Sequence, residues 1–485
     1  MLIDVGNIFC KCHYSGIELA KGIDQELDEY LKIKRPSTFF GSRATKQNFD
    51  NYRHFYSVLT HKFPTGFLPQ VVEILKELGA KYELNDTRGE IPKFTKNLCT
   101  TYGNDEMFDT QREAMLSINQ YVDGIYFPRA IIDAATNAGK TMIMMGWFDN
   151  IEDCKALVLI HSNLVFKQLV KDFEQFFGTI GQISATNFSI QPITVAMNKT
   201  LLNRISGTAG AGLKKELSKY FNTVIIDEGH KVGGEEYQKL LKLLDIPIRL
   251  AISGTALESK NKVKAISVIA QTGPVAYKIS NQQMIDSGQS KKPKVHMILT
   301  KHPAPKVCIT YDDFVHEHKF YNPHQLEKIR ELLTLHDEKQ FVIIFDEIQQ
   351  GLWLYEQLKD FWGIACVHGK DSFREEKIEK FKKYELRILL TSTILKEGIN
   401  IKNIDAMVNL LGEESSITVK QFMGRGLRTM KDGSKELLWY DFFHDCKHLE
   451  EHSRARIRIY KKEGYEIHYD YEHSSFGTPK RKKNG

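Results

Sequence analysis

The sequence has few of the features that mark small secreted or membrane proteins. Its seven cysteines are odd in number and scattered over 485 residues, which disfavours a disulfide framework and fits a reducing compartment. No window reaches the roughly 18 apolar residues that a membrane span needs, and no basic leader precedes the apolar start, so we expect neither membrane insertion nor export. With only 13 prolines and 33 glycines, the chain is not fibrous or low in complexity. These absences favour a globular cytoplasmic protein.

The sequence also lacks a large excess of positive or negative charge. Lys and Arg number 67 against 61 Asp and Glu, so the formal net charge is only +6, and any affinity for nucleic acid must come from local patches. At about 150 residues per domain, the length allows roughly three domains and excludes a lone small binding module.

Short apolar runs rich in β-branched residues alternate with helical patterns in two sets. This alternation predicts βαβ units and parallel sheets that are buried on both faces, hence an α/β fold with two such domains in tandem. The first set is 130–133, 156–160, 193–196, 223–226 and 248–252, and the second is 341–345, 364–367, 387–391, 406–410 and 437–440.

The remaining segments suggest a four-part organisation. Helices expected at about 22–33 and 68–79 indicate a small α+β domain at the N-terminus. The polar stretch Met284–Lys294 is the expected linker between the two sheets. We therefore expect a small domain at 1–100, parallel-sheet domains at 101–288 and 289–448, and a basic extension at 449–485.

A phosphate-binding loop follows the first apolar run. The segment AATNAGKT lies between the run AIID and the helical pattern MIMMGWF, and it fits GxxxxGK[ST] except that Ala134 replaces the first glycine. In such a loop backbone N–H groups cradle the phosphates, the lysine meets the β/γ oxygens and the final hydroxyl ligates Mg²⁺. ATP and Mg²⁺ are the expected cofactors. The residues expected to hold them are Asn137, Ala138, Gly139, Lys140 and Thr141.

Two carboxylates follow a later run of the same set. Asp227 and Glu228 begin the segment DEGH directly after TVII. Because ligands bind at the carboxyl ends of parallel strands, Asp227 is placed to hold Mg²⁺ and Glu228 to orient or deprotonate the attacking water. An acidic loop that caps the next helix would give the same pattern. The expected position of both motifs on one sheet favours the catalytic interpretation.

The second domain offers positive charge for a transferred phosphoryl group. In QFMGRGLR, Arg425 and Arg428 are three residues apart and share a face if the segment is helical. Both guanidiniums could then act as arginine fingers. An arginine pair is also common on a solvated helix face, and it is the ordered set of motifs that favours catalysis.

Together, AATNAGKT, DEGH, SGT (253–255) and QFMGRGLR resemble motifs I, II, III and VI of superfamily 2 helicases, within about residues 105–445. Within that superfamily the chain resembles the UvsW-type branched-DNA helicases of bacteriophages, including their small N-terminal domain. The resemblance implies two RecA-like domains that close around ATP. It also implies ATP-driven unwinding, branch migration and fork regression in recombination and repair, in the host cytoplasm if the source is a phage.

The resemblance further assigns individual residues. FDTQ (108–111) resembles the Q motif, in which Gln111 would contact adenine, and the segments 161–169, 195–201 and 391–405 resemble motifs Ia, Ib and V. Motif Ib is altered, because Met197 and Lys199 replace the usual Thr and Gln. The implied coupling residues are His230, Ser253, Thr255, Gly398 and Gln421, and the implied nucleic-acid contacts are Gln168, Thr200 and Thr391.

A basic and aromatic segment lies near the N-terminus. Residues 31–62 hold seven Lys or Arg and one acidic residue, Asp50, interleaved with aromatic residues. The basic groups could bind phosphates, while the rings either stack on bases or form the core of this small domain. The candidate contacts to duplex DNA are Arg43, Lys46 and Arg53.

Three weaker patterns have simpler explanations. SGTAGAG (206–212) follows no expected strand and lacks the GxGxxG order, so we interpret it as a flexible insertion. Cys10, Cys12 and His13 have no second metal-ligand pair at finger spacing, and His316 and His318 alternate along an expected strand. Burial in strands explains both groups better than a metal does.

Two other functions remain open. A duplex translocase that moves without separating strands would need the same ATP site, although no nuclease or methyltransferase motif is recognisable beside it. An ATP-gated clamp or annealing factor would bind ATP and scarcely hydrolyse it, whereas Glu228 and both arginines favour hydrolysis. We expect DNA as the main partner, recombination or replication proteins as further partners, and a monomer as the working form.

Overall fold

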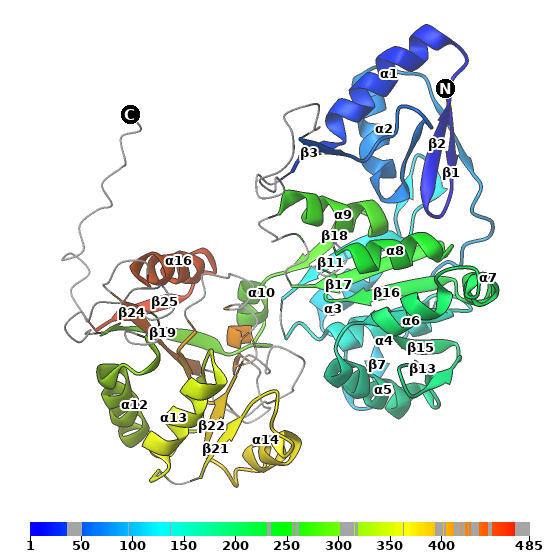
Figure 1. The fold of residues 1–485 in the computed structure, drawn as a ribbon. Helices are drawn as coiled ribbons and strands as arrows, with labels where there is room; N and C mark the ends of the chain where they lie inside the picture. Colours follow the sequence, from blue (N-terminus) through cyan, green and yellow to red (C-terminus); the bar gives the residue numbers. More distant parts are fainter. Residues whose placement is uncertain are drawn as a thin grey trace, which may run out of the picture. The chain divides into compact units, whose positions relative to one another are not determined.

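A computed structural model gives the fold. It describes residues 1–35, 51–95, 97–135, 137–229, 234–254, 257, 261–300, 315, 319–361, 363–392, 401, 404–411, 419, 422–424, 426–427, 436–444 and 449–470. The chain divides into two compact units, Met1–Ser280 and Asn281–Gly485 (Figure 1). Within these ranges, no helix combines the length and apolar character of a membrane span.

The N-terminal region of the first unit is a small sheet with helices packed on it, as the expected α+β domain requires. The strand order is β5-β2-β1-β6, with β1 and β6 parallel and the other pairs antiparallel. Its elements are β1 (Leu2–Val5), β2 (Phe9–His13), α1 (Ile17–Tyr30), β3 (Lys32–Lys34), β4 (Tyr52–His54), β5 (Lys62–Pro64), the 3₁₀ helix η2 (Thr65–Phe67), α2 (Leu68–Glu77) and β6 (Glu83–Asp86).

Helix α1 begins and ends earlier than the sequence predicts. It spans Ile17–Tyr30 and not 22–33, because Lys32–Lys34 leaves the helix and pairs with Tyr52–His54. The partner strand lies about 20 residues further along the chain, so local periodicity could not reveal the pairing. The prediction of a helix at 68–79 is confirmed by α2.

The rest of the first unit is built on a large sheet of order β14-β13-β15-β12-β16-β17-β11-β18, parallel except at β13–β14. All five strands predicted here are confirmed, and β13, β14 and β18 were not predicted. The elements are β7 (Thr101–Tyr102), β8 (Asp105–Glu106), α3 (Asp109–Leu116), β9 (Tyr121–Val122), β10 (Ile125–Tyr126), β11 (Arg129–Ala134), α4 (Lys140–Asn150), β12 (Ala156–Ile160), α5 (Asn163–Phe177), β13 (Gly181–Ile183), β14 (Phe188–Ser189), β15 (Ile193–Met197), α6 (Asn198–Ile205), α7 (Ala211–Tyr220), β16 (Thr223–Asp227), α8 (Glu235–Leu243), β17 (Ile248–Ser253), α9 (Lys262–Thr272) and β18 (Val275–Ile279).

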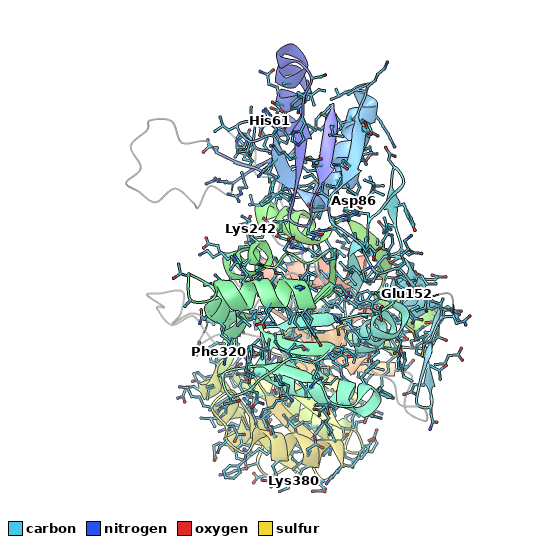
Figure 2. All side chains as sticks on the ribbon, turned by 90° about the vertical axis from the view of Figure 1, so that its right-hand side faces the viewer. His61, Asp86, Glu152, Lys242, Phe320 and Lys380 are labelled. Carbon is cyan, nitrogen blue, oxygen red and sulfur yellow. The ribbon has the colours of Figure 1, made fainter. Side chains whose placement is uncertain are left out.

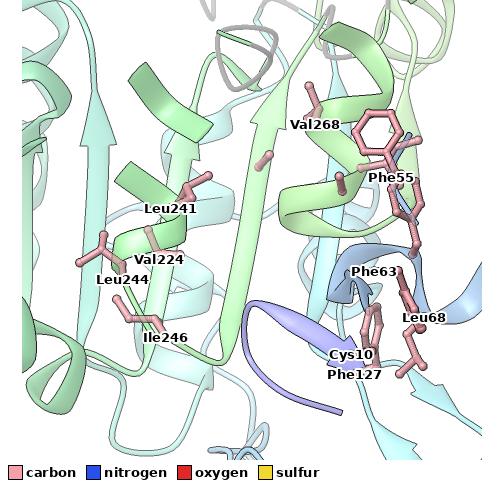
Figure 3. Packing of buried hydrophobic residues seen from close by; sticks show 14 of the residues in the cluster. Cys10, Phe55, Phe63, Leu68, Phe127, Val224, Leu241, Leu244, Ile246 and Val268 are labelled. Carbon is pink, nitrogen blue, oxygen red and sulfur yellow. The ribbon is translucent and has the colours of Figure 1, made fainter. Parts of the chain in front are cut away.

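One hydrophobic core runs from the N-terminal region into the large sheet. It joins Phe63 and Leu68 of the small domain to Val268 of α9 and to Val224 of β16 (Figure 3). Cys10 and Cys12 belong to this core, which confirms that they are buried strand residues, and the described residues hold no group of side chains suited to a metal ion. The small domain is therefore packed on the first large sheet and shares its core.

The second unit contains another parallel sheet, of order β21-β22-β20-β23-β24-β19-β25. The five strands predicted from the second set of apolar runs are confirmed. The elements are α10 (Asn281–Asp286), β19 (Lys292–Thr300), α12 (Pro323–Leu335), β20 (Phe341–Ile344), α13 (Ile348–Leu358), β21 (Ile364–Val367), α14 (Arg374–Lys382), β22 (Ile388–Thr391), β23 (Ala406–Asn409), β24 (Glu436–His444), α16 (Leu449–Lys462) and β25 (Glu466–Tyr469).

Two connecting segments differ from the prediction. The expected linker 284–294 overlaps α10 and the start of β19, and the two units meet at Ser280, ahead of it. Its lysines are typical of a linker in the sequence, but Lys292 and Lys294 alternate with buried residues of β19, and Lys291 is itself buried. Similarly, the stretch 206–212 joins α6 to α7, and its last two residues already belong to α7.

Candidate active site

The carboxyl ends of three adjacent strands bring the nucleotide motifs together. In the sheet order, β17 lies between β16 and β11, and Ser253 of β17 is in register with Asp133 of β11. Asp227 ends β16, and the phosphate-binding loop follows β11. Motifs I, II and III thus share one edge of one sheet, as expected, and this edge is where open parallel sheets bind ligands.

The phosphate-binding loop turns from strand to helix through two left-handed residues. Asn137 has φ 88° and Gly139 has φ 72°, and α4 starts directly after Gly139. The N-cap residue Gly139 has no side chain to cap this end of α4, so the first N–H groups of the helix face the loop, and the helix dipole favours negative charge there. Ala134 is the buried last residue of β11 and has no left-handed φ, which explains why a glycine is not needed at that position.

Gln111 ties the Q motif to this loop. Its side chain is buried, with Oε1 accepting from the backbone N–H of Phe108 at 3.0 Å and Nε2 donating to the carbonyl of Ala138 at 3.0 Å. A Cβ atom on Gly139 would come within 2.2 Å of Gln111 Nε2. The glycine is therefore required twice, for its left-handed backbone and for the close approach of the glutamine.

The lysine of the loop faces the second carboxylate of DEGH. Lys140 Nζ lies 3.8 Å from Glu228 Oε1, and both side chains are about four-fifths buried. Glu228 has φ 57°, an uncommon conformation for a residue with a side chain, and such strain tends to occur where a side chain must be held in one direction. A phosphate at the start of α4 would lie within reach of the ammonium group.

The donor set fits Mg²⁺ and ATP. Thr141 lies in the first turn of α4 and Asp227 at the end of β16, so a hydroxyl and a carboxylate border the loop. Mg²⁺ prefers a few such oxygen ligands together with phosphate oxygens and water. Asn137, Ala138 and Gly139 supply the backbone of the cradle, and Lys140 supplies its charge.

Family models agree with this site and extend it. The model for the res subunit of type III restriction enzymes matches residues 104–258, and the model for the helicase conserved C-terminal domain matches residues 324–430. Together the two matches span more than half of the chain, and they contain motifs I to III and V to VI in order. The chain is a superfamily 2 helicase.

Relatives of the helicase include DNA motors. It is 22% identical over 354 residues to the DNA 3'-5' translocase XPB2 of Sulfurisphaera tokodaii, covering 64% of this chain and 76% of the relative. It is 21% identical over 340 residues to the ATP-dependent DNA helicase uvsW of Enterobacteria phage T4, covering 65% of each. The helicase thus spans slightly less than two thirds of the phage relative.

Solved structures support the fold. The S. cerevisiae Dbp5 structure with RNA and ADP BeF3 superposes with a TM-score of 0.53 at 17% identity, covering 74% of this chain and 89% of that one. This likeness concerns the fold alone. Together with the two parallel sheets, it supports the expected α/β architecture of tandem RecA-like domains preceded by a small N-terminal segment.

Phe108 is a candidate that the sequence argument passed over in favour of Gln111. It precedes α3, its side chain is half exposed, and its backbone N–H is fixed by Gln111. An exposed ring beside a residue expected to contact adenine can stack on the base. The available signal was an aromatic residue at the first position of FDTQ, where solvent exposure could not be judged.

Several predicted residues of the helicase fall outside the described residues. These are the coupling residues His230, Thr255, Gly398 and Gln421, the arginines Arg425 and Arg428, the basic residues Arg43 and Lys46, and the histidines His316 and His318. Ser253 is described and is fully buried at the end of β17, between the strands that carry motifs I and II.

The described candidates for nucleic-acid contact differ in their surroundings. Gln168 is exposed on α5 and donates to Asp172 at 2.7 Å, and Thr200 is half-buried on α6. Arg53 is half-buried with its guanidinium over the ring of Phe55, which belongs to the core. Thr391 differs from the expectation: it is fully buried at the end of β22 and its hydroxyl donates to the carbonyl of Ser392, so it presents no surface to a nucleic acid.

Proposed function

We propose that this superfamily 2 helicase hydrolyses Mg²⁺–ATP to remodel branched DNA by unwinding, branch migration and fork regression. The observation that carries the ATPase proposal is the meeting of Lys140, Glu228 and the Gln111-braced loop at one sheet edge. The DNA proposal is supported by the printed activities of the two curated relatives, a DNA translocase and a phage DNA helicase. The choice of branched substrates rests on the resemblance to UvsW-type helicases.

The residues of the first unit divide the chemistry between them. Lys140 and the N–H groups at the start of α4 bind phosphate oxygens, and Thr141 with Asp227 would hold Mg²⁺, which neutralises charge on the β/γ oxygens when it is bound. Glu228 accepts a hydrogen bond, and then the proton, from the attacking water. Arg425 and Arg428 are the proposed donors to the γ-phosphate, as motif VI implies.

Motion follows from differential binding. If the ATP-bound and ATP-free states grip DNA unequally, hydrolysis shifts the population between them and drives stepping. We propose His230, Ser253, Thr255, Gly398 and Gln421 as the residues that couple the two events, Gln168, Thr200, Arg43, Lys46 and Arg53 as the contacts to DNA, and a monomer as the working form.

Point mutations in the ATP site test the proposal. Lys140→Ala removes the phosphate-binding charge and Glu228→Gln removes the base, so each variant should lower DNA-stimulated ATP turnover by at least about 100-fold while circular dichroism stays unchanged. The pair Lys359–Glu356 provides a matched control, because its 2.7 Å ion pair is exposed. Lys359→Ala and Glu356→Gln should keep DNA-stimulated turnover. Near-normal turnover in Lys140→Ala and Glu228→Gln would refute the site.

A substrate panel tests the choice of DNA. Phosphate release should rise more with forked and four-way DNA than with linear duplex, single-stranded DNA or RNA, and the helicase should displace strands from forked DNA. A second candidate, a translocase that leaves duplex strands paired, is favoured by the printed name of the S. tokodaii relative. That candidate predicts displacement of a triplex-forming strand without separation of the duplex.

A further inference from the structure

The N-terminal region touches segments that lead into or out of the nucleotide motifs. Lys76 of α2 pairs with Asp123 in the β9–β10 turn at 2.6 Å. Asp86, the last residue of β6 (Figure 2), holds the guanidinium of Arg88, which also donates to the carbonyl of Tyr126 at 2.5 Å. That hairpin connects the Q-motif helix α3 to β11, which leads to the phosphate-binding loop. The small domain is thus attached where the Q motif joins motif I.

A second attachment is made to α9, the helix that follows motif III. A Cβ atom built on Gly66 of η2 would lie 1.9 Å from the carbonyl oxygen of Ile269 and 2.7 Å from that of Ala270. The backbones of η2 and α9 are therefore in direct contact. Because packed helices transmit displacement with little compression, a shift of η2 would reach α9.

The side chain of Arg129 contacts both the small domain and α9. It is the first residue of β11 and is fully buried. Its Nη1 donates to the carbonyl of Asn7, in the β1–β2 turn, at 2.6 Å, and its Nη2 donates to the carbonyl of Gln271, in the last turn of α9, at 2.8 Å. One guanidinium thus bonds the small domain to α9 from the strand of motif I.

Arg249 is a natural comparison for Arg129. It is paired in register with Arg129 on the neighbouring strand β17 and is also almost fully buried. Its Nε and Nη2 donate to the carbonyls of Ile246 and Leu244, at the end of α8, at 3.1 and 2.6 Å. Both arginines therefore bind carbonyls at or just beyond helix C-termini, where positive charge is favoured, but only the bonds of Arg129 reach the small domain.

The cost of burying Arg129 argues for a role beyond packing. Burial lowers the pKa of Arg129 well below its usual range, and the nearby guanidiniums of Arg249 and Arg88 lower it further. An apolar side chain would avoid this cost, since buried charges are often no more stabilising than apolar residues of similar volume. What the guanidinium adds is a fixed direction of hydrogen bonding to two separate backbones.

We propose that Arg129 is a positioning residue that fixes the small domain to β11 and α9, so that DNA held by the small domain acts directly on the ATP site. The six residues of β11 span about 20 Å from Arg129 to the start of motif I. The eleven residues of α9 span about 16 Å, and the amino end of this helix follows motif III. Arg129 itself touches no nucleotide. The inference rests on the proposed function in one respect, that DNA is the ligand of the small domain.

Three variants separate positioning from stability. Arg129→Met removes both bonds, Arg129→Lys keeps the charge and can reach one of the two carbonyls, and Arg249→Met removes the comparable bonds to the end of α8. We expect Arg129→Met to keep basal ATP turnover and DNA affinity within about twofold and to lose about tenfold of the stimulation by forked DNA. Arg129→Lys should recover part of the stimulation by forked DNA. Arg249→Met should keep this stimulation while losing about as much thermal stability as Arg129→Met.

Equal loss of stimulation in Arg129→Met and Arg249→Met, or full stimulation in Arg129→Met, would overturn the proposal. Should Arg129→Met not fold, Arg129→Lys replaces it in the comparison with Arg249→Met, and a partial loss of stimulation is then the expected result. Hydrogen exchange separates this inference from the proposed function, because it needs no DNA. A non-hydrolysable ATP analogue should slow exchange of the amides around Asn7 in the wild type and not in Arg129→Met, whether or not DNA stimulates turnover; no such difference would also overturn the proposal.

Discussion

In the first large sheet, the carboxyl ends of the strands form one edge and their amino ends form the opposite edge, and the two edges have different roles. At the carboxyl edge, Lys140 and Glu228 remain partly exposed, and three residues, Asn137, Gly139 and Glu228, have left-handed backbones. At the opposite edge, Arg129 and Arg249 are buried and bind backbone carbonyls. The carboxyl edge keeps polar groups accessible to a ligand at the cost of local strain. The other edge gives up access and fixes neighbouring segments in place.

This difference predicts opposite consequences of mutation. Changes at the carboxyl edge should remove turnover while leaving most of the stability, because few buried contacts depend on these side chains. Changes at the amino edge should lower stability while basal turnover per folded molecule stays near normal. Two glycines that leave no room for a Cβ atom, Gly139 at one edge and Gly66 near the other, allow this contrast to be tested with the same substitution.

Gly139→Ala should have the largest effect on function. The new methyl group would overlap Gln111 Nε2 and would hold alanine at a left-handed φ, which costs roughly 1–2 kcal/mol of stability. Displacement of the loop by a fraction of an ångström to relieve the overlap should lower ATP turnover by about 100-fold. Steady-state phosphate release and thermal unfolding measure the two effects.

Gly79→Ala is the control for Gly139→Ala. Gly79 has a left-handed φ of 61° and no neighbour within 4 Å of a Cβ atom, so alanine there brings the strain without the overlap. We expect a similar loss of stability and normal turnover. If Gly79→Ala lowered turnover as much as Gly139→Ala, strain and not the contact with Gln111 would account for the loss.

Gly66→Ala should produce the reverse result. A methyl group at this position meets the backbone of α9, which cannot yield as a side chain can, so the small domain must move away from α9. Overpacking of this kind costs about 1–3 kcal/mol, and the melting temperature should fall by several degrees. Basal ATP turnover, measured well below the transition, should stay within about twofold of the wild type.

Gly22→Ala provides the control in the same small domain. Gly22 lies inside α1 with open space around it, so alanine should stabilise the helix by about 0.5–1 kcal/mol. An unchanged melting temperature in Gly66→Ala, against an increase in Gly22→Ala, would contradict the close contact between η2 and α9.

The carboxyl edge could be predicted from the sequence, and the amino edge could not. AATNAGKT and DEGH each sit directly after an apolar run, so strand, loop and chemistry are encoded within about ten residues. Arg129 also lies beside an apolar run, but its partners Asn7 and Gln271 are more than 100 residues away in the sequence, and no local pattern predicts these contacts. For the same reason the sequence predicts a linker where β19 starts, because its pairing with β24 joins segments about 140 residues apart.

The exposure of single residues also required the structure. Phe108 and Phe67 are aromatic residues that directly precede helices, yet the first is half exposed and the second is buried beside the ring of Phe55. Thr391, expected to contact nucleic acid, is fully buried. Burial depends on which elements pack together, and a motif does not contain that information.

The smallest expected effect concerns the exposed ring at the carboxyl edge. Phe108→Ala removes little buried surface, so the melting temperature should hardly change, whereas loss of stacking on adenine should raise KM for ATP about tenfold, or about 1.4 kcal/mol, with kcat nearly constant. Phe188→Ala is the matched control, because Phe188 is 43% exposed on the far edge strand β14. The same KM change in both variants, or none in Phe108→Ala, would rule out a stacking role. A KM effect confined to Phe108→Ala, with an unchanged preference for ATP over GTP, would assign base selection to Gln111 and base affinity to the ring.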